Sequence, residues 1–186
     1  MTATNTSELT ETERRNLSAV ADVLPFWNSG DIEGLLEYYD DEIIWTNVGL
    51  EEVYDGKPAV RAFLTQLFTA IPDLEFSVQY KIARGDNVSE QWTIHGTHLK
   101  TFMGVPPTGR RIEIRAMSMV TLRDGKFLRD EFYWDTRAVM HQMGLLPSLA
   151  ATQSPVGRGF VWLATKSLNV LSTGGRRARR ARRSHR

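Results

Sequence analysis

The spacing of the apolar residues changes at Leu74, and this change limits the folds that the chain can adopt. Before Leu74, apolar residues recur every three or four positions, as they do on one face of a helix. After it, they recur at every second position, as on one face of a strand. Helices followed by consecutive strands are typical of an α+β fold with an antiparallel sheet, rather than of a parallel α/β sheet.

The helices expected in the first part have recognisable starting and stopping residues. Pro25 ends the first helix. Asp31 can cap the second, because a carboxylate accepts hydrogen bonds from the first N–H groups of a helix. Pro58 suits the start of the third, where the missing proline N–H costs no hydrogen bond, and Ile71-Pro72 stops it. The sequence therefore predicts helices over about residues 7–23, 31–39 and 58–70, with a short strand at 43–45.

The strands expected after this point are separated by residues that favour turns. Residues 84–87 contain Gly and Asp, Pro106-Pro107 lies in a longer loop, and Asp124-Gly125 is a strong signal for a two-residue hairpin. The predicted strands are 74–83, 88–100, 111–122 and 127–134, followed by a short helix over 136–143. The residues predicted to share one face are Phe76, Val78, Tyr80 and Ile82 in the first strand, and Ile112, Ile114, Ala116, Ser118, Val120 and Leu122 in the third.

Short motifs accompany these strands: Gly96-Thr97-His98, the run from Phe102-Met103-Gly104 through Pro106-Pro107 to Arg110-Arg111, Asp124-Gly125-Lys126, Tyr133-Trp134-Asp135 and Gln142-Met143-Gly144. With these motifs in place, residues 17–146 resemble the SnoaL-like polyketide (ester) cyclase branch of the NTF2-like superfamily. The resemblance implies an α+β cone, in which three N-terminal helices pack on a strongly curved antiparallel or mixed sheet. Isomerases, cyclases, hydrolases, dehydratases and non-catalytic modules share this scaffold, so the resemblance implies a fold more than a reaction.

Comparison with the cyclases places their two functional groups on residues of a different kind. The resemblance implies an intramolecular aldol closure without a cofactor, in which a strand carboxylate acts as general acid and base and a His lies one strand away. Counted from the hairpin glycine, the carboxylate position is Phe132 and the His position is Ser118. Both groups that the cyclase reaction uses are therefore replaced here.

Comparison with the related limonene-epoxide-hydrolase-like branch gives a partial match. That branch places its acid three residues later, at Asp135, and holds water with an aromatic-x-Asn that is matched by Trp45 and Asn47. Its Arg-x-Asp pair falls on Gln91 and Thr93. The ketosteroid-isomerase-like branch places its base near Asn47, and an amide cannot abstract a proton at neutral pH.

Asp135 is the leading catalytic candidate from the sequence. It can serve as the N-cap of the following helix, or as a cavity carboxylate whose pKa is raised by apolar surroundings. His95 is the second candidate, because it shares a strand face with Gln91 and Thr93, which the hydrolase comparison turns toward the cavity. We expect Asp135→Asn to abolish turnover without unfolding the chain. The predicted substrate-binding residues are Trp45, Asn47, Gln91, Trp92, Thr93, Ser118 and Phe132.

Composition excludes several other chemistries. The chain has no cysteine, which removes disulfides and thiolate chemistry, and its four His show no metal-ligand spacing. We therefore expect neither a metal nor a cofactor. The first residues have no basic and apolar signal segment, so a cytoplasmic location is expected. Residues 1–6 are predicted to be a disordered N-terminus, residues 7–148 the folded domain and residues 149–186 an extension.

The charge is distributed unevenly between these parts. Residues 1–135 hold all 22 Asp and Glu but only 13 of the 23 Lys and Arg, and residues 136–186 hold the other ten bases and no acid. Seven Arg lie between Arg176 and Arg186, after an amphipathic segment at 160–171. Such a tail is predicted to be a solvated, disordered end, or to bind weakly to an anionic membrane or to nucleic acid.

Two functions remain open from the sequence. The first is an enzyme doing cofactor-free acid/base chemistry, of the cyclase, isomerase or hydrolase type, on an apolar carbonyl-containing or polycyclic metabolite. The second is a non-catalytic ligand-binding or dimerisation module with a basic localisation tail. In either case the resemblance implies a homodimer.

Overall fold

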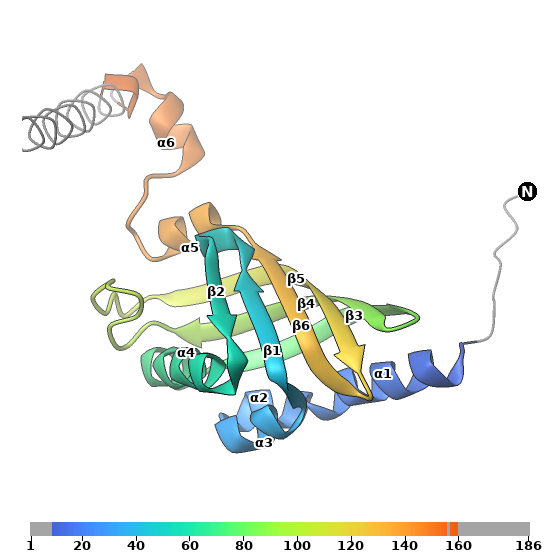
Figure 1. Cartoon of the computed structure of the whole chain (residues 1–186). Helices are drawn as coiled ribbons and strands as arrows, with labels where there is room; N and C mark the ends of the chain where they lie inside the picture. The colour runs from blue at the N-terminus through green and yellow to red at the C-terminus, as the bar shows by residue number, and fades with distance from the viewer. Residues whose placement is uncertain (1–8, 156, 160–186) are drawn as a thin grey trace, which may run out of the picture. The chain divides into compact units, whose positions relative to one another are not determined.

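The computed structural model, which describes residues 9–155 and 157–159, contains one curved sheet of six strands (Figure 1). Their order is β2-β1-β6-β5-β4-β3. Neighbouring strands are antiparallel except β1 and β6, which are parallel. The predicted antiparallel or mixed sheet is therefore confirmed. The strands are β1 (Tyr39–Asn47), β2 (Glu52–Asp55), β3 (Glu75–Arg84), β4 (Asn87–Thr97), β5 (Arg111–Arg123) and β6 (Lys126–Trp134).

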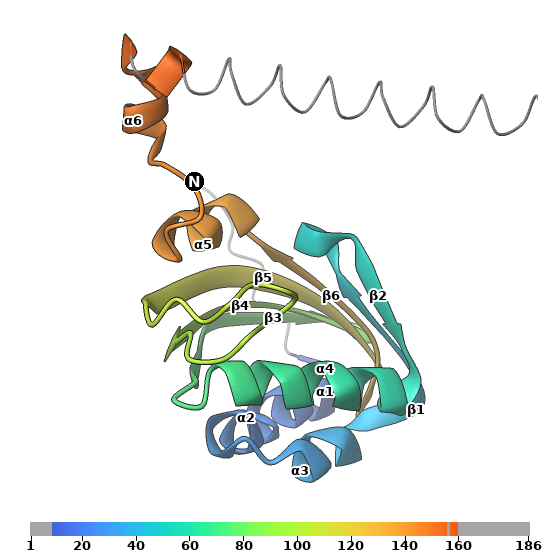
Figure 2. The ribbon, with the colours of Figure 1, turned by 90° about the vertical axis from the view of Figure 1, so that its left-hand side faces the viewer.

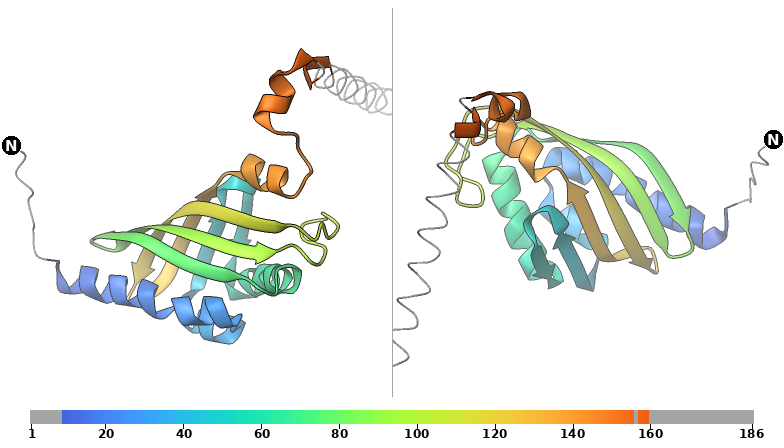
Figure 3. Two further views of the ribbon diagram at one scale, coloured as in Figure 1. Left: turned by 180° about the vertical axis from the view of Figure 1, so that it is seen from behind. Right: turned by 90° about the horizontal axis from the view of Figure 1, so that it is seen from above.

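Four helices lie on one side of this sheet, as Figures 2 and 3 show: α1 (Glu11–Asp22), α2 (Leu24–Ser29), α3 (Ile32–Glu37) and α4 (Gly56–Ala70). The start of α1 is a capping box. The Thr10 side chain accepts from the Glu13 N–H (3.2 Å), and the Glu13 carboxylate accepts from the Thr10 N–H (2.8 Å). The predicted cap of α3 is confirmed, because the Asp31 carboxylate accepts from the Gly34 N–H at 3.0 Å.

One helix more than the expected three is present. The first helix, α1, ends at Asp22, close to the expected end, but a further short helix, α2, begins at Leu24 with Pro25 in its first turn. A proline lacks only an N–H that the first turn leaves unpaired, so the chain can begin a new helix there. The short strand expected at 43–45 extends over the whole of β1, and β2 follows after a 3-10 turn, η1 (Val48–Leu50). The strand β2 was not predicted, because four residues give too little periodicity to recognise.

A β-bulge in β3 changes which side chains point to the inner face of the sheet. Even-numbered residues point inward before the bulge and outward after it. Val78 pairs with Trp92, and the next residue to pair is Tyr80, opposite Gln91. The extra residue reverses the alternation of side chains. Phe76 is buried, whereas Tyr80 and Ile82 are 71% and 72% exposed on the outer face of the sheet. The prediction that the apolar residues of this strand share one face is therefore wrong for its second half. On β5, by contrast, the predicted alternation is confirmed.

The chain divides into two compact units, with the boundary between Leu145 and Leu146. The first unit ends with α5 (Thr136–Gln142), the short helix predicted after the last strand. The second contains α6 (Leu149–Gln153), where the Ser148 hydroxyl accepts from the Ala151 N–H at 3.1 Å. The predicted amphipathic segment and the Arg-rich tail lie outside the described residues. Within residues 9–155 and 157–159, no helix is both long and apolar enough to cross a membrane.

Candidate active site

A cavity lies between the helices and the inner face of the sheet, bordered by α1, α2, α4 and all six strands except β2. The cavity volume is about 70 Å³. Most of the 22 lining residues are aliphatic or aromatic. The four other residues, Asn47, Glu90, Ser118 and Asp130, all come from strands.

Aromatic rings form a connected part of the cavity lining. Phe76 stacks between Trp27 and Trp92, with ring centroids 5.1 Å apart on both sides and interplanar angles of 18° and 28°. Trp45 contacts Phe132 at a centroid distance of 5.1 Å, and these two rings also contact Trp27 and Trp92, at 6.1 Å and 6.4 Å. Flat apolar walls of this kind suit a ligand with planar or unsaturated carbon, because such a ligand can stack on the exposed ring faces.

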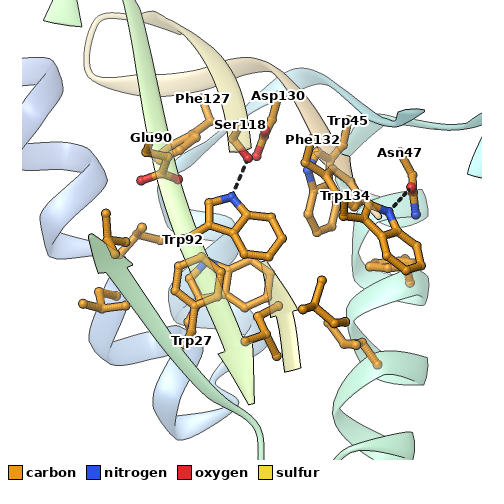
Figure 4. Close-up of a pocket in the computed structure, with 18 of the residues that line it drawn as sticks. Trp27, Trp45, Asn47, Glu90, Trp92, Ser118, Phe127, Asp130, Phe132 and Trp134 are labelled. Atoms are coloured by element: carbon orange, nitrogen blue, oxygen red, sulfur yellow. Dashed lines mark hydrogen bonds between the residues drawn. The ribbon is translucent and has the colours of Figure 1, made fainter. Parts of the chain in front are cut away.

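Two carboxyl groups are buried in this apolar setting, as Figure 4 shows. Glu90 lies on the inner face of β4, where Ser118 of β5 is its partner across the ladder. Asp130 lies on β6 and pairs in register with Trp45 of β1. The two acids are only 8% and 7% exposed. Glu90 Oε2, Asp130 Oδ1 and the Trp45 indole N–H have no hydrogen-bond partner among the described residues.

Burial shifts the proton affinity of both acids. It raises the pKa of Asp130 to about 8, an effect that the charge of Glu90 reinforces and that the Ser118 and Trp45 side chains oppose. Burial also raises the pKa of Glu90 to about 7, and Lys81, its partner on β3, acts in the opposite direction. Two interacting acids titrate as a pair. Near neutral pH this pair holds a proton on one carboxyl while the other is ionised, so that it contains both an acid and a base.

Two indole N–H groups orient the polar side chains around this pair. The Trp92 Nε1–H donates to Ser118 Oγ at 2.9 Å, which leaves the serine hydroxyl hydrogen free to point toward Asp130. The Trp134 Nε1–H donates to Asn47 Oδ1 at 2.7 Å and fixes the direction of that amide. Both bonds are drawn in Figure 4. The polar groups of the cavity are thus held in place by its aromatic residues.

The sequence matches the SnoaL-like polyketide cyclase family over residues 18–143. The chain belongs to this family. Among solved structures, a protein of Jannaschia sp. CCS1 assigned to the SnoaL-like polyketide cyclases is 25% identical, with a TM-score of 0.69 over 76% of this chain and 99% of that one. IdmH of Streptomyces antibioticus, assigned as a polyketide cyclase, is 27% identical, with a TM-score of 0.61 over 69% of this chain and 98% of that one.

A third structure of this fold is TerC, which was co-crystallised with polyporic acid. It is 23% identical, with a TM-score of 0.58 over 70% of this chain and 98% of that one. A comparison with curated proteins finds no match. The NTF2-like fold and the SnoaL-like branch expected from the sequence motifs are thereby confirmed.

The expected site residues of this SnoaL-like protein fall into two groups. Trp45, Asn47, Trp92, Ser118 and Phe132 all line the cavity. Gln91, Thr93 and His95 lie on the other face of β4, because Glu90, Trp92 and Ile94 face the cavity. The expected strand face is therefore reversed. The His95 ring is about a third exposed (35%), with Nδ1 3.9 Å from the Glu113 carboxylate.

Asp135 lies outside the cavity of the SnoaL-like domain. Its Oδ1 accepts from the Ala138 N–H at 2.9 Å, so it caps α5. The side chain is exposed and borders an open hollow on the outer face of the sheet, together with Met117 and Tyr133. The structure thus supports the cap that the sequence suggested, and it separates Asp135 from Asn47.

The buried acids were missed at the sequence level, although a signal was present. Glu90 lies at even spacing between Val88 and Trp92, and Asp130 lies two residues before Phe132. In an alternating strand, this spacing places a carboxyl on the apolar face. Such a placement is costly without a partner or a function. Among the described residues, no group of three or more His, Asp or Glu is arranged to hold a metal ion.

Proposed function

We propose that this protein is a cofactor-free acid/base enzyme acting on a small apolar, carbonyl-containing or polycyclic metabolite, with Glu90 and Asp130 as its proton-transferring pair. The observation that carries the proposal is the pair itself. Two buried carboxyls with unpartnered oxygens lie in a cavity that is otherwise almost entirely apolar. Burying two acids that each keep an unpartnered oxygen costs stability, and their raised pKa values match the needs of a catalyst near neutral pH.

The reaction that fits best is an intramolecular aldol-type ring closure. Ionised Glu90 removes a proton from the carbon next to a carbonyl, and the protonated Asp130 and the Trp45 N–H donate hydrogen bonds to the oxygen on which negative charge develops. The carbanion then forms a carbon–carbon bond to a second carbonyl carbon of the same substrate, and the new alkoxide takes the proton from Asp130. Transfer of the proton from Glu90 to Asp130 restores the pair. Isomerisation and hydrolysis would use the same two groups.

The family and one relative support the ligand class. Members of the SnoaL-like family are described as polyketide cyclases, and TerC, with the same fold, was crystallised with polyporic acid. The aromatic lining of the cavity, which includes Trp27, Trp92 and Phe132, suits a ligand of this kind. A largely apolar lining of this kind would also limit contact of a carbanion with bulk water, which would otherwise protonate it.

The test is deuterium uptake by model ketones. Linear 1,3-diketones and bicyclic aromatic ketones are incubated with the protein in deuterated buffer near neutral pH, and exchange at the carbon next to the carbonyl is followed by NMR. We expect acceleration by the wild type, and a loss of about 100-fold or more in Asp130→Asn and in Glu90→Gln. Asp135→Asn is the matched control, because asparagine also caps helices. Loss of exchange in Asp135→Asn with full activity in Asp130→Asn would instead assign the proton transfer to Asp135.

A second proposal concerns assembly. The outer face of the sheet exposes Met117 (52%), Met119 (45%) and Tyr133 (48%), which border a shallow hollow. A continuous apolar patch of this kind is typical of an interface. We propose that a second copy of the chain covers it, as the sequence resemblance implied.

Ligand binding without any deuterium exchange would favour the alternative of a non-catalytic binding module.

A further inference from the structure

The connection between β4 and β5, residues 98–110, supplies part of the cavity wall. Phe102 of this connection lines the cavity, and its ring contacts Phe63 of α4 with centroids 5.9 Å apart. Because Phe102 is held by a loop and not by a helix or strand, the position of this wall depends on how the loop is fastened.

The tip of the connection is a tight hairpin. Phe102 and Val105 exchange two backbone hydrogen bonds, of 3.1 Å and 2.9 Å. Met103 and Gly104 between them have φ values of 51° and 78°. Two consecutive positive φ values match the twist of paired strands, and the two bonds close residues 102–105 into one tight turn.

The base of the connection is fastened to two elements. His98 exchanges backbone bonds with the far side of the loop, since its N–H donates to the Arg110 carbonyl (3.0 Å) and its carbonyl accepts from the Gly109 N–H (2.9 Å). The N–H groups of Leu99 and Lys100 both donate to the carbonyl of Ala70, at the end of α4. These bonds fix the base but do not reach residues 101–107.

The side chain of His98 provides the connection to the second half of the loop. It is completely buried. Its Nδ1 accepts from the Thr108 N–H at 3.4 Å and lies 3.2 Å from Thr108 Oγ1. A nitrogen that accepts from an N–H carries no proton, so the ring is neutral with its hydrogen on Nε2. That Nε2–H is buried and has no hydrogen-bond partner among the described residues.

Adding a proton to Nδ1 would set it against the Thr108 N–H, leave Thr108 Oγ1 as the group that can accept from it, and place a charge in a buried site. We propose that neutral His98 is the latch that holds the 99–108 hairpin, with Phe102, against the cavity, and that protonation of the ring releases it. Burial lowers the pKa of His98, which agrees with a closed state that disfavours the charge. The latch depends on the loop geometry alone, and not on the acid/base role of Glu90 and Asp130.

The charged side chains near the His98 ring interact with other groups or with solvent. Asp73, which follows α4, accepts from the N–H and the hydroxyl of Thr97, both at 2.7 Å. These bonds from Thr97 lower the pKa of Asp73, and Arg111 at the start of β5, which pairs in register with Thr97, acts in the same direction. Arg110 directs its guanidinium to the Gln142 carbonyl (3.5 Å), and Lys100 is exposed. The His98 ring contacts Thr108 through Nδ1, and the backbone of Lys100 acts on the pKa of His98 in the direction opposite to burial.

Acidification should therefore open the hairpin. Around the Glu90–Asp130 pair, in contrast, acidification should stabilise the closed structure. Both Glu90 and Asp130 become neutral as the pH falls, which relieves the cost of burying their charges. An opening of residues 99–108 at low pH thus cannot arise from that pair. An open hairpin would admit or release ligand, and a closed one would exclude water during the reaction.

Hydrogen–deuterium exchange of the full chain, corrected for the intrinsic effect of pH, tests this proposal. We expect opening of residues 99–108 to increase by up to about tenfold for each pH unit below about 6.5. His98→Asn keeps an acceptor near the position of Nδ1 but cannot titrate, so its exchange should be independent of pH. His95→Asn, on the outer face, and the Glu90→Gln/Asp130→Asn double variant should both retain the wild-type response.

NMR of the His98 ring nitrogens in the wild type provides a second measurement that needs no variant. We expect the Nε2–H tautomer at neutral pH and a pKa for His98 below the ordinary histidine value of about 6.5. Exchange of residues 99–108 that does not change with pH, or a neutral ring protonated on Nδ1, would overturn the proposal. Loss of the pH response in the double variant would also overturn it, because the response would then belong to the carboxyl pair.

Discussion

Glu90 and Asp130 hold their protons to a higher pH in the folded chain than in the unfolded chain, where carboxyl pKa values lie near about 4. Between these values the folded state binds more protons, so stability is present at acid pH and is lost as the pH rises through about 7 and about 8. We expect Glu90→Gln/Asp130→Asn to remove this loss, on the order of 1–3 kcal/mol per group between pH 5.5 and 8. Urea denaturation at both pH values measures this loss of stability. A double variant whose free energy of unfolding changes with pH as much as that of the wild type would contradict the prediction.

Asp135 affects stability rather than the cavity. Replacing it by Ala leaves the Ala138 N–H without its acceptor and should lower the free energy of unfolding by about 1 kcal/mol. Asp135→Asn should restore most of the loss, because an asparagine oxygen can accept the same bond. Chemical denaturation of the two variants provides the comparison. Equal stability of Asp135→Ala and wild type would show that the cap contributes nothing.

The residues of the site were harder to predict than the residues of the fold. Asp31, Pro58 and Asp124-Gly125 act on their own neighbours, so the sequence identifies their caps and turns directly. The two acids matter only because β4 and β6 enter the same cavity, although Glu90 and Asp130 are 40 positions apart in the sequence. Motif counting also led to Asp135, which has the right spacing from the hairpin but lies past the end of the strand.

At the scale of elements, α5 is joined to the sheet by the side chain of Gln142, whose amide makes the two backbone hydrogen bonds that a neighbouring strand would make. Gln142 Oε1 accepts from the Glu113 N–H at 2.6 Å, and its Nε2–H donates to the Glu113 carbonyl at 3.0 Å. Both backbone groups of Glu113 are thereby paired at the start of β5. The bond could not be predicted from the sequence, since the two residues are distant and neither belongs to a recognised turn or cap.

Removing this amide tests how firmly α5 is attached. We expect Gln142→Ala to lower the free energy of unfolding by about 1–3 kcal/mol, because both groups of Glu113 lose a partner. Gln91→Ala, at an exposed position of β4, should have little effect and serves as the control. Thermal or urea denaturation measures the difference. Indistinguishable unfolding of the two variants would mean that other contacts hold α5.

At the scale of the whole molecule, the sheet separates the surface around the cavity from an apolar surface on its other side. Its inner face carries the cavity, and its outer face carries the apolar patch of Met117, Met119 and Tyr133. The order of helices and strands predicts this layered arrangement, because each element must bury its apolar side. The outer patch could not be predicted fully, since the bulge in β3 also adds Tyr80 and Ile82 to the outer face.

The apolar patch on the outer face of the sheet predicts that the protein has two subunits. We expect the protein to be a homodimer by light scattering after size-exclusion chromatography, and Met119→Glu to shift it toward the monomer by placing a charge in an apolar interface. Leu9→Glu, at an exposed residue before α1, should leave the mass unchanged. A monomeric wild type at high concentration would rule out this use of the outer face.

The bulge in β3 means that the strand can lose one residue without changing either surface. Deleting Gln79 would restore strict alternation and leave the pairing on both sides of it unchanged, with Tyr80 still opposite Gln91 on the outer face and Lys81 still opposite Glu90. Relatives that lack one residue at this point are therefore expected to keep both the ligand cavity and the outer apolar face.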